Sequence, residues 1–146
     1  MIEIKHVKNE NELKQCIKIR HILFVVGMNV PQSIEVDQYD CINDICDHFL
    51  IKYKNDNVGT IRCLKINDSI IKLQRFGFYK EYRHLGFGSE TLRYIEDYYK
   101  KKGYYHLILD AQVKAYQFYI KNGYQKISDE FMEAGIMHIK MEKKLK

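Results

Sequence analysis

Long apolar runs are missing from this 146-residue chain, and none approaches the length of a membrane span. Residues 1–10 alternate polar and apolar side chains, which is not the pattern of a signal peptide. Internal repeats, linkers and low-complexity segments are missing as well. We therefore expect a single domain over residues 1–146, located in the cytoplasm and without a membrane partner.

Cysteine and arginine are scarce. No two of the four cysteines form a Cys-x-x-Cys pair, and the spacing of Cys41, Cys46 and His48 matches no zinc site. We therefore expect reduced cysteines and no metal. Only five of the 24 basic residues are arginines, and the net charge of +5 is carried mostly by scattered lysines. This distribution argues against a nucleic-acid partner, although a mild positive field favours an anionic ligand.

Glycine accounts for only eight residues, and two of them stand where the pattern changes from strand to helix. Residues 83–89 read Arg-His-Leu-Gly-Phe-Gly-Ser, and apolar residues follow at helical spacing in 91–99. Glycines that let an anion approach the free N–H groups of a helix start predict a phosphate-binding loop. The loop lacks the Gly-Lys-Ser/Thr of a P-loop and the third glycine of a dinucleotide fingerprint. The alternative is a turn whose glycines serve only close packing.

The remaining patterns predict the order of elements. A strand at 2–7 and a helix ending at Gly27 precede an acidic irregular segment from Pro31 to Asp47. Strands at 48–53, 58–66 and 70–78 form an antiparallel meander, and a helix follows the glycine loop. A buried strand at 105–109, a helix at 113–121 and closing strands at 124–127 and 136–141 complete the chain, with Glu130 and Glu133 in the last loop. A strand–helix–strand connection implies parallel neighbours, so the sheet is expected to splay between 70–78 and 104–110 and leave a slot for an extended ligand.

A second motif follows the glycine loop at a distance of about thirty residues. It has the form Ala-x-x-Phe-Tyr-x-x-x-Gly-Tyr, carried by Ala115, Phe118, Tyr119, Gly123 and Tyr124. Together with Arg-x-x-Gly-x-Gly at residues 83–88, it resembles the GNAT superfamily of acetyl-CoA-dependent N-acetyltransferases. The resemblance implies a GNAT fold of the α/β (α+β) class, with a mixed, mostly antiparallel sheet of about seven strands and about four flanking helices.

Further segments look like a compact subgroup of glucosamine-6-phosphate N-acetyltransferase-like proteins. These are Val-Pro-x-x-x-Glu-x-Asp-x-x-Asp at 30–40, Gly-Thr-x-Arg at 59–62, and the ending at 133–141. This resemblance implies direct acetyl transfer to the primary amine of an amino-sugar phosphate, D-glucosamine 6-phosphate of the UDP-GlcNAc pathway. A polyamine or protein amine as acceptor, and a non-catalytic acyl-CoA-binding module, remain alternatives. The chain departs from the subgroup at Gly27-Met28, where a Glu-Gln pair is common.

The resemblance also implies roles for individual residues. The strand at 74–78 would pair with pantetheine, the glycine loop would hold the pyrophosphate, and Tyr119 would protonate the leaving thiolate. Coenzyme contacts are expected from Phe76, Gly77, Phe78, Arg83, His84, Leu85, Gly86, Phe87, Gly88, Ser89, Gln112 and Phe118. Gln112 stands where the family usually has an asparagine.

The acceptor side is less defined. Candidate contacts are Arg20, Asp37, His48, Arg75, Glu133 and His138. The general base is one of Glu35, Asp37, His48, Glu133 and His138, or water. The arginines Arg20, Arg62 and Arg75 would bind an acceptor phosphate or pair with acids inside the protein. The oligomeric state is left open, but the apolar strand at 136–141 could pair with a second copy of the chain in a homodimer.

Overall fold

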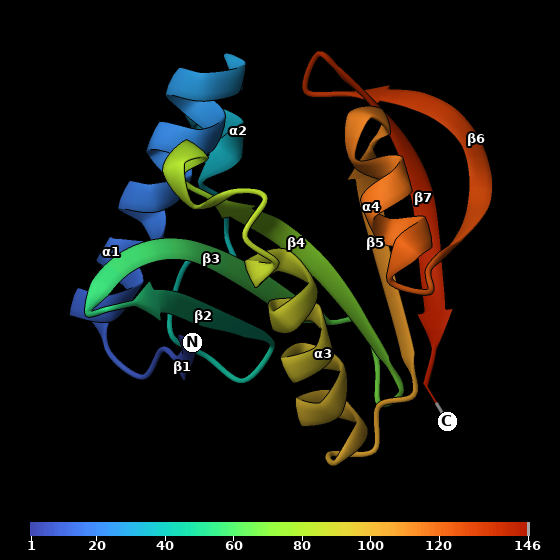
Figure 1. Cartoon of the computed structure of the whole chain (residues 1–146), viewed down its shortest axis with the longest axis horizontal. Coiled ribbons are helices and arrows are strands. Elements are labelled where there is room, and N and C mark those ends of the chain that lie inside the picture. Colours follow the sequence, from blue (N-terminus) through green and yellow to red (C-terminus); the bar gives the residue numbers. More distant parts are fainter. Residues whose placement is uncertain (146) are drawn as a thin grey trace.

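The computed structural model describes residues 1–145, which form a seven-stranded sheet in the order β1-β2-β3-β4-β5-β7-β6 (Figure 1). The strands are β1 (Ile2–His6), β2 (Cys46–Tyr53), β3 (Asp56–Lys65), β4 (Ile70–Phe78), β5 (His106–Gln112), β6 (Gln125–Glu133) and β7 (Ile136–Lys144). The helices are α1 (Glu10–Arg20), α2 (Gln32–Glu35), α3 (Phe87–Lys100) and α4 (Tyr116–Lys121), with a π-helical turn η1 (His21–Val26) and 3-10 turns η2 (Lys80–Tyr82) and η3 (Val113–Ala115). The expected α/β class, with a mixed and mostly antiparallel sheet, is confirmed.

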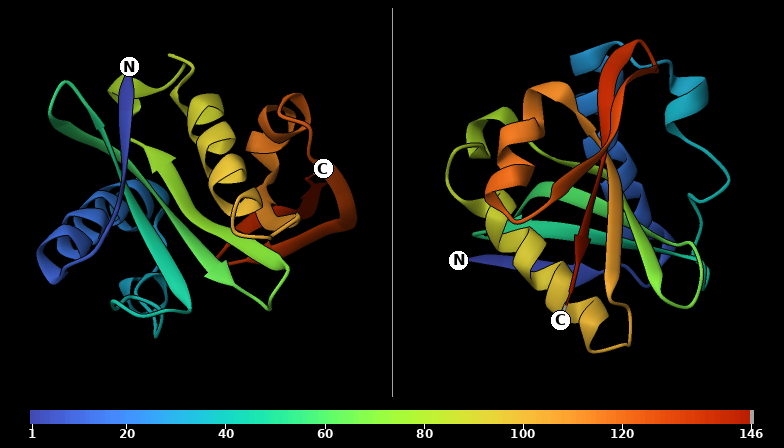
Figure 2. Two further views of the ribbon diagram at one scale, coloured as in Figure 1. Left: turned by 90° about the horizontal axis from the view of Figure 1, so that it is seen from below. Right: turned by 90° about the vertical axis from the view of Figure 1, so that its right-hand side faces the viewer.

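Helices cover both faces of the sheet. Helix α1 packs on one face of β2, β3 and β4, while α3 and α4 lie on the other (Figures 1 and 2). Adjacent residues of β2 show the two sides, because Leu50 belongs to the core under α1 and Phe49 to the core under α3. Strand residues alternate between faces, so burial on both sides leaves residues 46–51 of β2 buried without interruption.

The sheet opens between β4 and β5, its only parallel pair among the described strands. Pairing runs from Ile70 opposite His106 to Leu73 opposite Leu109 and then stops, although both strands continue. The cause lies on the other edge of β4, where the register with β3 shifts so that Arg75 and Phe76 together stand opposite one β3 residue. Arg75 takes a positive φ of 52° in this bulge. Bulges bend a strand, so β4 turns away from β5 and produces the predicted splay.

Two expectations about the end of the chain were wrong. The residues placed in a loop with Glu130 and Glu133 belong to β6, and the turn to β7 is made by Ala134 and Gly135, both with positive φ. Strand β6 is an exposed edge, so it lacks the apolar alternation that marks a half-buried strand. Strand β7 pairs with β5 on one side and β6 on the other, so it has no free edge for pairing across a homodimer.

The described residues also bear on metals, cysteines and membranes. Within residues 1–145, no group of three His, Cys, Asp or Glu side chains is placed to hold a metal ion. All four cysteines are free thiols, and only Cys41 is exposed. None of the described helices is long and apolar enough to cross a membrane.

Candidate active site

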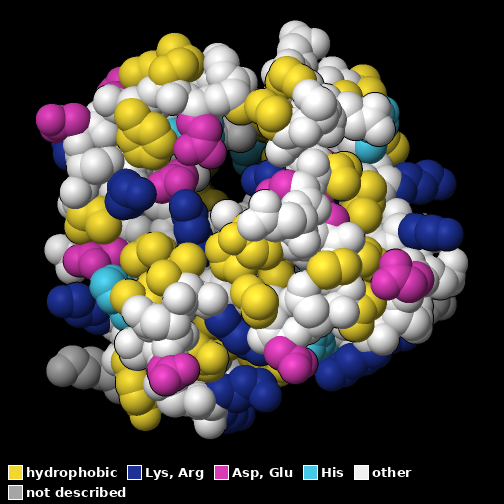
Figure 3. Space-filling view, turned by 180° about the vertical axis from the view of Figure 1, so that it is seen from behind, with side chains coloured by type: hydrophobic (Ala, Val, Ile, Leu, Met, Phe, Trp, Pro, Cys, Tyr) yellow, Lys and Arg dark blue, Asp and Glu magenta, His cyan; other side chains and the backbone are white. Residues whose placement is uncertain are grey.

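A cleft of about 510 Å³ occupies the space where β4 and β5 part. One wall is apolar and comes from η1 and the segment up to α2, with Leu23, Phe24, Met28, Val30 and Ile34. The opposite wall comes from the end of β5, from η3 and α4, and from the β6–β7 turn. Figure 3 shows a hollow between the two halves of the molecule, with acidic and basic side chains along its rim.

The floor of the cleft is the free edge of β4. Because pairing with β5 stops at Leu73, the backbone of residues 74–78 has no strand partner on the β5 side. Strand edges carry N–H and C=O groups that bind extended ligands by adding a strand. Phe76, Gly77 and Phe78 all line the cleft. This edge is therefore suited to an elongated ligand with amide groups, as predicted for these three residues.

The glycine loop leads from β4 to the start of α3. Gly86 immediately precedes the helix with a φ of 83°, and no side chain caps the first turn. The first N–H groups of an uncapped helix are free donors at the positive end of its dipole. A Cβ on Gly88 would lie 2.9 Å from the ring of Phe118, so glycine is needed there for close approach. The loop thus combines a helix start whose N–H groups no side chain caps with tight packing against Phe118, so the two alternatives left by the sequence do not exclude each other.

The other loop residues differ in how they lie. His84 and Leu85 are exposed, and Ser89 is half-buried in the first turn of α3. The Phe87 side chain is buried in the core with Phe78, so only its backbone can face a ligand. Arg83 lines the cleft, and its Nε donates a hydrogen bond of 2.9 Å to the carbonyl of Phe78.

Tyr119 lines the cleft from α4. Its half-buried ring packs edge-on against Phe118 and Tyr124, at 5.1 and 5.8 Å between centroids. Burial raises the pKa of the Tyr119 phenol, which keeps the hydroxyl protonated. No residue of 1–145 forms a hydrogen bond with this hydroxyl, so its proton is available to a ligand.

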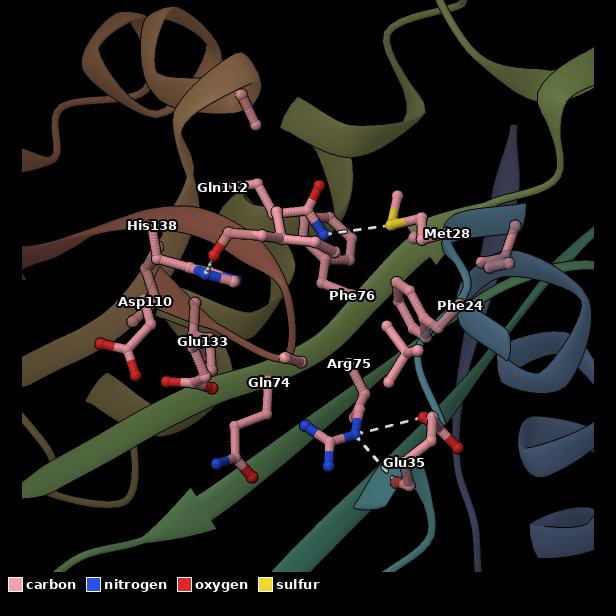
Figure 4. A pocket seen from close by; sticks show the side chains of 18 of the residues that line it. Phe24, Met28, Glu35, Gln74, Arg75, Phe76, Asp110, Gln112, Glu133 and His138 are labelled. Carbon is pink, nitrogen blue, oxygen red and sulfur yellow. Dashed lines mark hydrogen bonds and ion pairs between the residues drawn. The ribbon is translucent and has the colours of Figure 1, made fainter. Parts of the chain in front are cut away.

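Gln112 lies at the end of β5 and connects the two walls. Its Nε2 donates a hydrogen bond of 3.2 Å to Met28 Sδ across the cleft (Figure 4). Met28 belongs to the Gly27-Met28 pair, where the resembled subgroup commonly has Glu-Gln. At this point the wall of the cleft therefore has a thioether and not a carboxylate. Phe118 does not line the cleft; it packs behind it between Gly88 and Phe76.

Several expected acceptor residues belong instead to a network of ion pairs behind the apolar wall. Arg20 is 1% exposed and pairs with Glu35 at 2.8 Å and with Asp40 at 2.6 Å. Arg62, also 1% exposed, pairs with Asp37 at 2.8 Å. Although burial acts to raise it, hydrogen bonding and charge from Arg20 hold the pKa of Asp40 well below its usual value.

This network corrects the expectation for Arg20 and Asp37, which do not line the cleft. His48 is also outside: it is 3% exposed, its Nε2 lies 2.9 Å from the carbonyl of Tyr39, and burial lowers its pKa. Sequence spacing could not distinguish an arginine that faces a ligand from one that holds a loop. Arg75 does reach the cleft, but it pairs with Glu35 at 3.2 Å (Figure 4).

Glu133 and His138 do line the cleft, and they face it together with Asp110, which the sequence reasoning missed (Figure 4). Asp110 pairs with Lys72 at 3.0 Å and with Lys140 at 3.4 Å. Its Oδ1 is buried without a hydrogen bond to any described residue. A charged residue directly after the apolar run 107–109 was the signal that could have revealed it.

Comparisons with known proteins agree with this geometry. A family model described as "Acetyltransferase (GNAT) domain" matches residues 36–145. The uncharacterized protein YyaT of Bacillus subtilis is 36% identical to this chain over 99% of it and 97% of its own length. A solved structure described as a candidate N-acetyltransferase from Lactobacillus plantarum has a TM-score of 0.90, with 23% identity and 99% of both chains covered. A GNAT acetyltransferase from Elizabethkingia anophelis, solved with acetyl-CoA bound, has a TM-score of 0.75 at 17% identity, covering 99% of this chain and 98% of its own.

Proposed function

Because the chain belongs to the acetyltransferase (GNAT) family, we propose that it transfers the acetyl group of acetyl-CoA directly to a primary amine. One observation carries the proposal. The free edge of β4 lines the cleft at the splay, Arg83 of the lining begins the loop that leads to the open start of α3, and Tyr119 lines the cleft with a hydroxyl that has no hydrogen-bond partner among residues 1–145. These are a binding surface for amides, a binding site for phosphates and a proton donor.

The donor would lie along β4. Backbone groups of residues 74–78 would pair with the pantetheine amides, and the N–H groups at the start of α3 would bind the pyrophosphate. A free N–H on the β4 edge, best that of Phe76, would polarise the thioester carbonyl as an oxyanion hole does. Tyr119 would then give its proton to the sulfur as the C–S bond breaks.

The charges of the cleft bear on the acceptor. Arg75 is paired with Glu35, and Lys72 with Asp110, so neither cation is free for an acceptor phosphate. Of the other two cations of the lining, Arg83 belongs to the loop assigned to the coenzyme, and Lys114 of η3 is exposed and forms no ion pair with any of residues 1–145. Glu133 lines the cleft and forms no ion pair with any of residues 1–145. The unpaired Glu133 supports an acceptor that is cationic, such as a polyamine or a lysine side chain, whereas the unpaired Lys114 supports the amino-sugar phosphate that the subgroup resemblance implied; we propose the cationic acceptor. Glucosamine 6-phosphate remains the alternative.

The proposal is tested by release of thiol from acetyl-CoA with four acceptors: glucosamine 6-phosphate, glucosamine, spermidine and a lysine peptide. We expect turnover with an amine, fastest with spermidine or the peptide. Faster turnover with the sugar phosphate than with these two would overturn the cationic assignment. Tight coenzyme binding by calorimetry, without turnover on any amine, would show a binding module and not an enzyme.

A further inference from the structure

We propose that His138 is the general base that takes the proton from the attacking amine, an assignment that rests on the proposed function. His138 lies on β7 directly opposite Gln112 of β5. Both residues line the cleft, as does Tyr119. Figure 4 shows the imidazole extending from β7 into the cleft, between Gln112 and the carboxylates of Asp110 and Glu133. The base and the proposed acid therefore border the same space.

The hydrogen bond of the ring sets its tautomer. Nδ1 of His138 lies 2.7 Å from the carbonyl oxygen of Ile136. A carbonyl oxygen can only accept, so Nδ1 must carry the hydrogen, and in the neutral ring the lone pair is on Nε2. Nε2 forms no hydrogen bond with any of residues 1–145. The free nitrogen is therefore an acceptor, which is the form a general base requires.

The ring is also held in place from the side. Phe131, opposite His138 on β6, stacks on it with 5.9 Å between centroids and 26° between the planes. Only 9% of His138 is exposed. A base held at two points needs little ordering when the substrate arrives, which is how positioned groups accelerate a reaction.

The other titratable groups of the cleft are less suited. Glu35 is 2% exposed and bonded to Arg20 and Arg75. Asp110 is paired with lysines from β4 and β7. Glu133 is exposed and forms no ion pair with any of residues 1–145, so no charged partner fixes its carboxylate, whereas Ile136 and Phe131 hold the imidazole of His138 in place. Glu133 is better placed to attract the cationic acceptor toward Nε2.

The proposed step balances its protons. Nε2 of His138 takes one proton from the ammonium, and the freed lone pair on nitrogen forms the N–C bond with the thioester carbon. The C–S bond then breaks, and the sulfur takes the hydroxyl proton of Tyr119. The resulting phenolate takes the second proton from nitrogen, which leaves the neutral amide. The proton on His138 passes to solvent, so one proton is released for each acetyl group transferred.

The test uses two variants that keep different parts of the ring. His138→Asn retains a donor at the position of Nδ1 for the Ile136 carbonyl, whereas His138→Gln reaches the position of Nε2; neither can take up a proton. His106→Gln is the control, since His106 begins β5 outside the cleft and pairs with Glu142. Each protein is assayed for kcat/KM against pH with the amine that wild type acetylates best, and for acetyl-CoA binding by calorimetry.

We expect both His138 variants to bind acetyl-CoA as wild type does and to lose about 100-fold or more in kcat. In wild type, we expect kcat/KM to stop rising with pH once Nε2 of His138 is free to accept a proton. In the two His138 variants, kcat/KM should continue to rise with the fraction of uncharged amine, and His106→Gln should keep the wild-type profile. A wild-type pH profile in either His138 variant would overturn the assignment. It would also be overturned if Glu133→Gln, assayed in the same way, lost the acidic limb of the profile while both His138 variants kept it. If neither variant binds acetyl-CoA, the pH profile of the wild-type protein is the deciding measurement. A kcat/KM that follows only the fraction of uncharged amine excludes a protein base. Absence of wild-type turnover with every amine would instead refute the proposed function.

Discussion

Replacing Tyr119 with phenylalanine removes one oxygen from the cleft and nothing else. The hydroxyl has no hydrogen-bond partner within residues 1–145, and the ring keeps its contacts with Phe118 and Tyr124. We therefore expect the free energy of unfolding to change by less than about 0.5 kcal/mol. The loss of a general acid should lower kcat about 100-fold, which corresponds to about 2.7 kcal/mol of transition-state stabilisation.

Tyr124 offers a matched control in the same helix–strand corner. Its hydroxyl donates a hydrogen bond of 2.9 Å to Glu96, and its side chain is outside the cleft. Tyr124→Phe should therefore show the opposite behaviour, with kcat unchanged and the free energy of unfolding lowered by about 1.5–3 kcal/mol. Stopped thiol-release assays measure kcat, and urea denaturation measures the free energy of unfolding.

The pH dependence adds a further check on Tyr119. Because burial raises the pKa of this phenol above its ordinary value, the acid stays protonated, and no basic limb from it is expected below about pH 9. A kcat for Tyr119→Phe equal to that of wild type would remove Tyr119 from the mechanism. Equal losses of kcat in the Tyr119 and Tyr124 variants would show that the corner matters only for packing.

Three further predictions concern the loop and the ion-pair network. Gly88→Ala should weaken coenzyme binding by about 1.4 kcal/mol or more in calorimetry, because its Cβ would lie 2.9 Å from the ring of Phe118, and binding equal to that of wild type would contradict this steric argument. In Gly86→Ala the Cβ would meet no atom within 4 Å, so the only expected cost is backbone strain at the positive φ, about 1–2 kcal/mol of folding free energy. Arg20→Ala leaves two buried carboxylates short of a partner and should lower the free energy of unfolding by about 3–5 kcal/mol in urea, whereas a change under about 1 kcal/mol would show the pairs to be dispensable. The pKa of Asp40 is held below its usual value in the folded protein, so its ionised carboxylate stabilises the fold above about pH 4, and this stabilisation is lost as the pH falls through the folded pKa. Acid should therefore lower the free energy of unfolding of wild type more than that of Asp40→Asn. An equal decrease in both proteins would contradict this.

The sequence predicted best what depends on local spacing. Glycines at 86 and 88 before a helical pattern, and Phe118-Tyr119 before Gly123, are short-range signals, and the structure brings their two segments into contact through Gly88 and Phe118. The splay was also predictable, because a strand–helix–strand connection after an antiparallel meander forces a parallel pair.

What the sequence could not predict depends on tertiary placement. From the sequence, Arg20 and Arg75 were equally able to bind an acceptor phosphate or to pair with acids inside the protein, but Arg20 is buried outside the cleft and Arg75 reaches the cleft from a bulge. Most of β6 was not predicted as strand, because an exposed edge strand has little alternation of apolar and polar residues. Asp110 was missed because its role arises from β5 diverging beside Lys72 of β4, which no spacing along the chain records.

We propose that acetyl is transferred from acetyl-CoA to an amine in the cleft where β4 and β5 part. The most direct measurement quantifies, by mass spectrometry of one reaction mixture, both free coenzyme A and acetylated amine over time. We expect the two products to appear in equal amounts with wild type, and both to form more slowly, still in equal amounts, with Tyr119→Phe. Free coenzyme A without acetylated amine, or the same rate in both proteins, would contradict it.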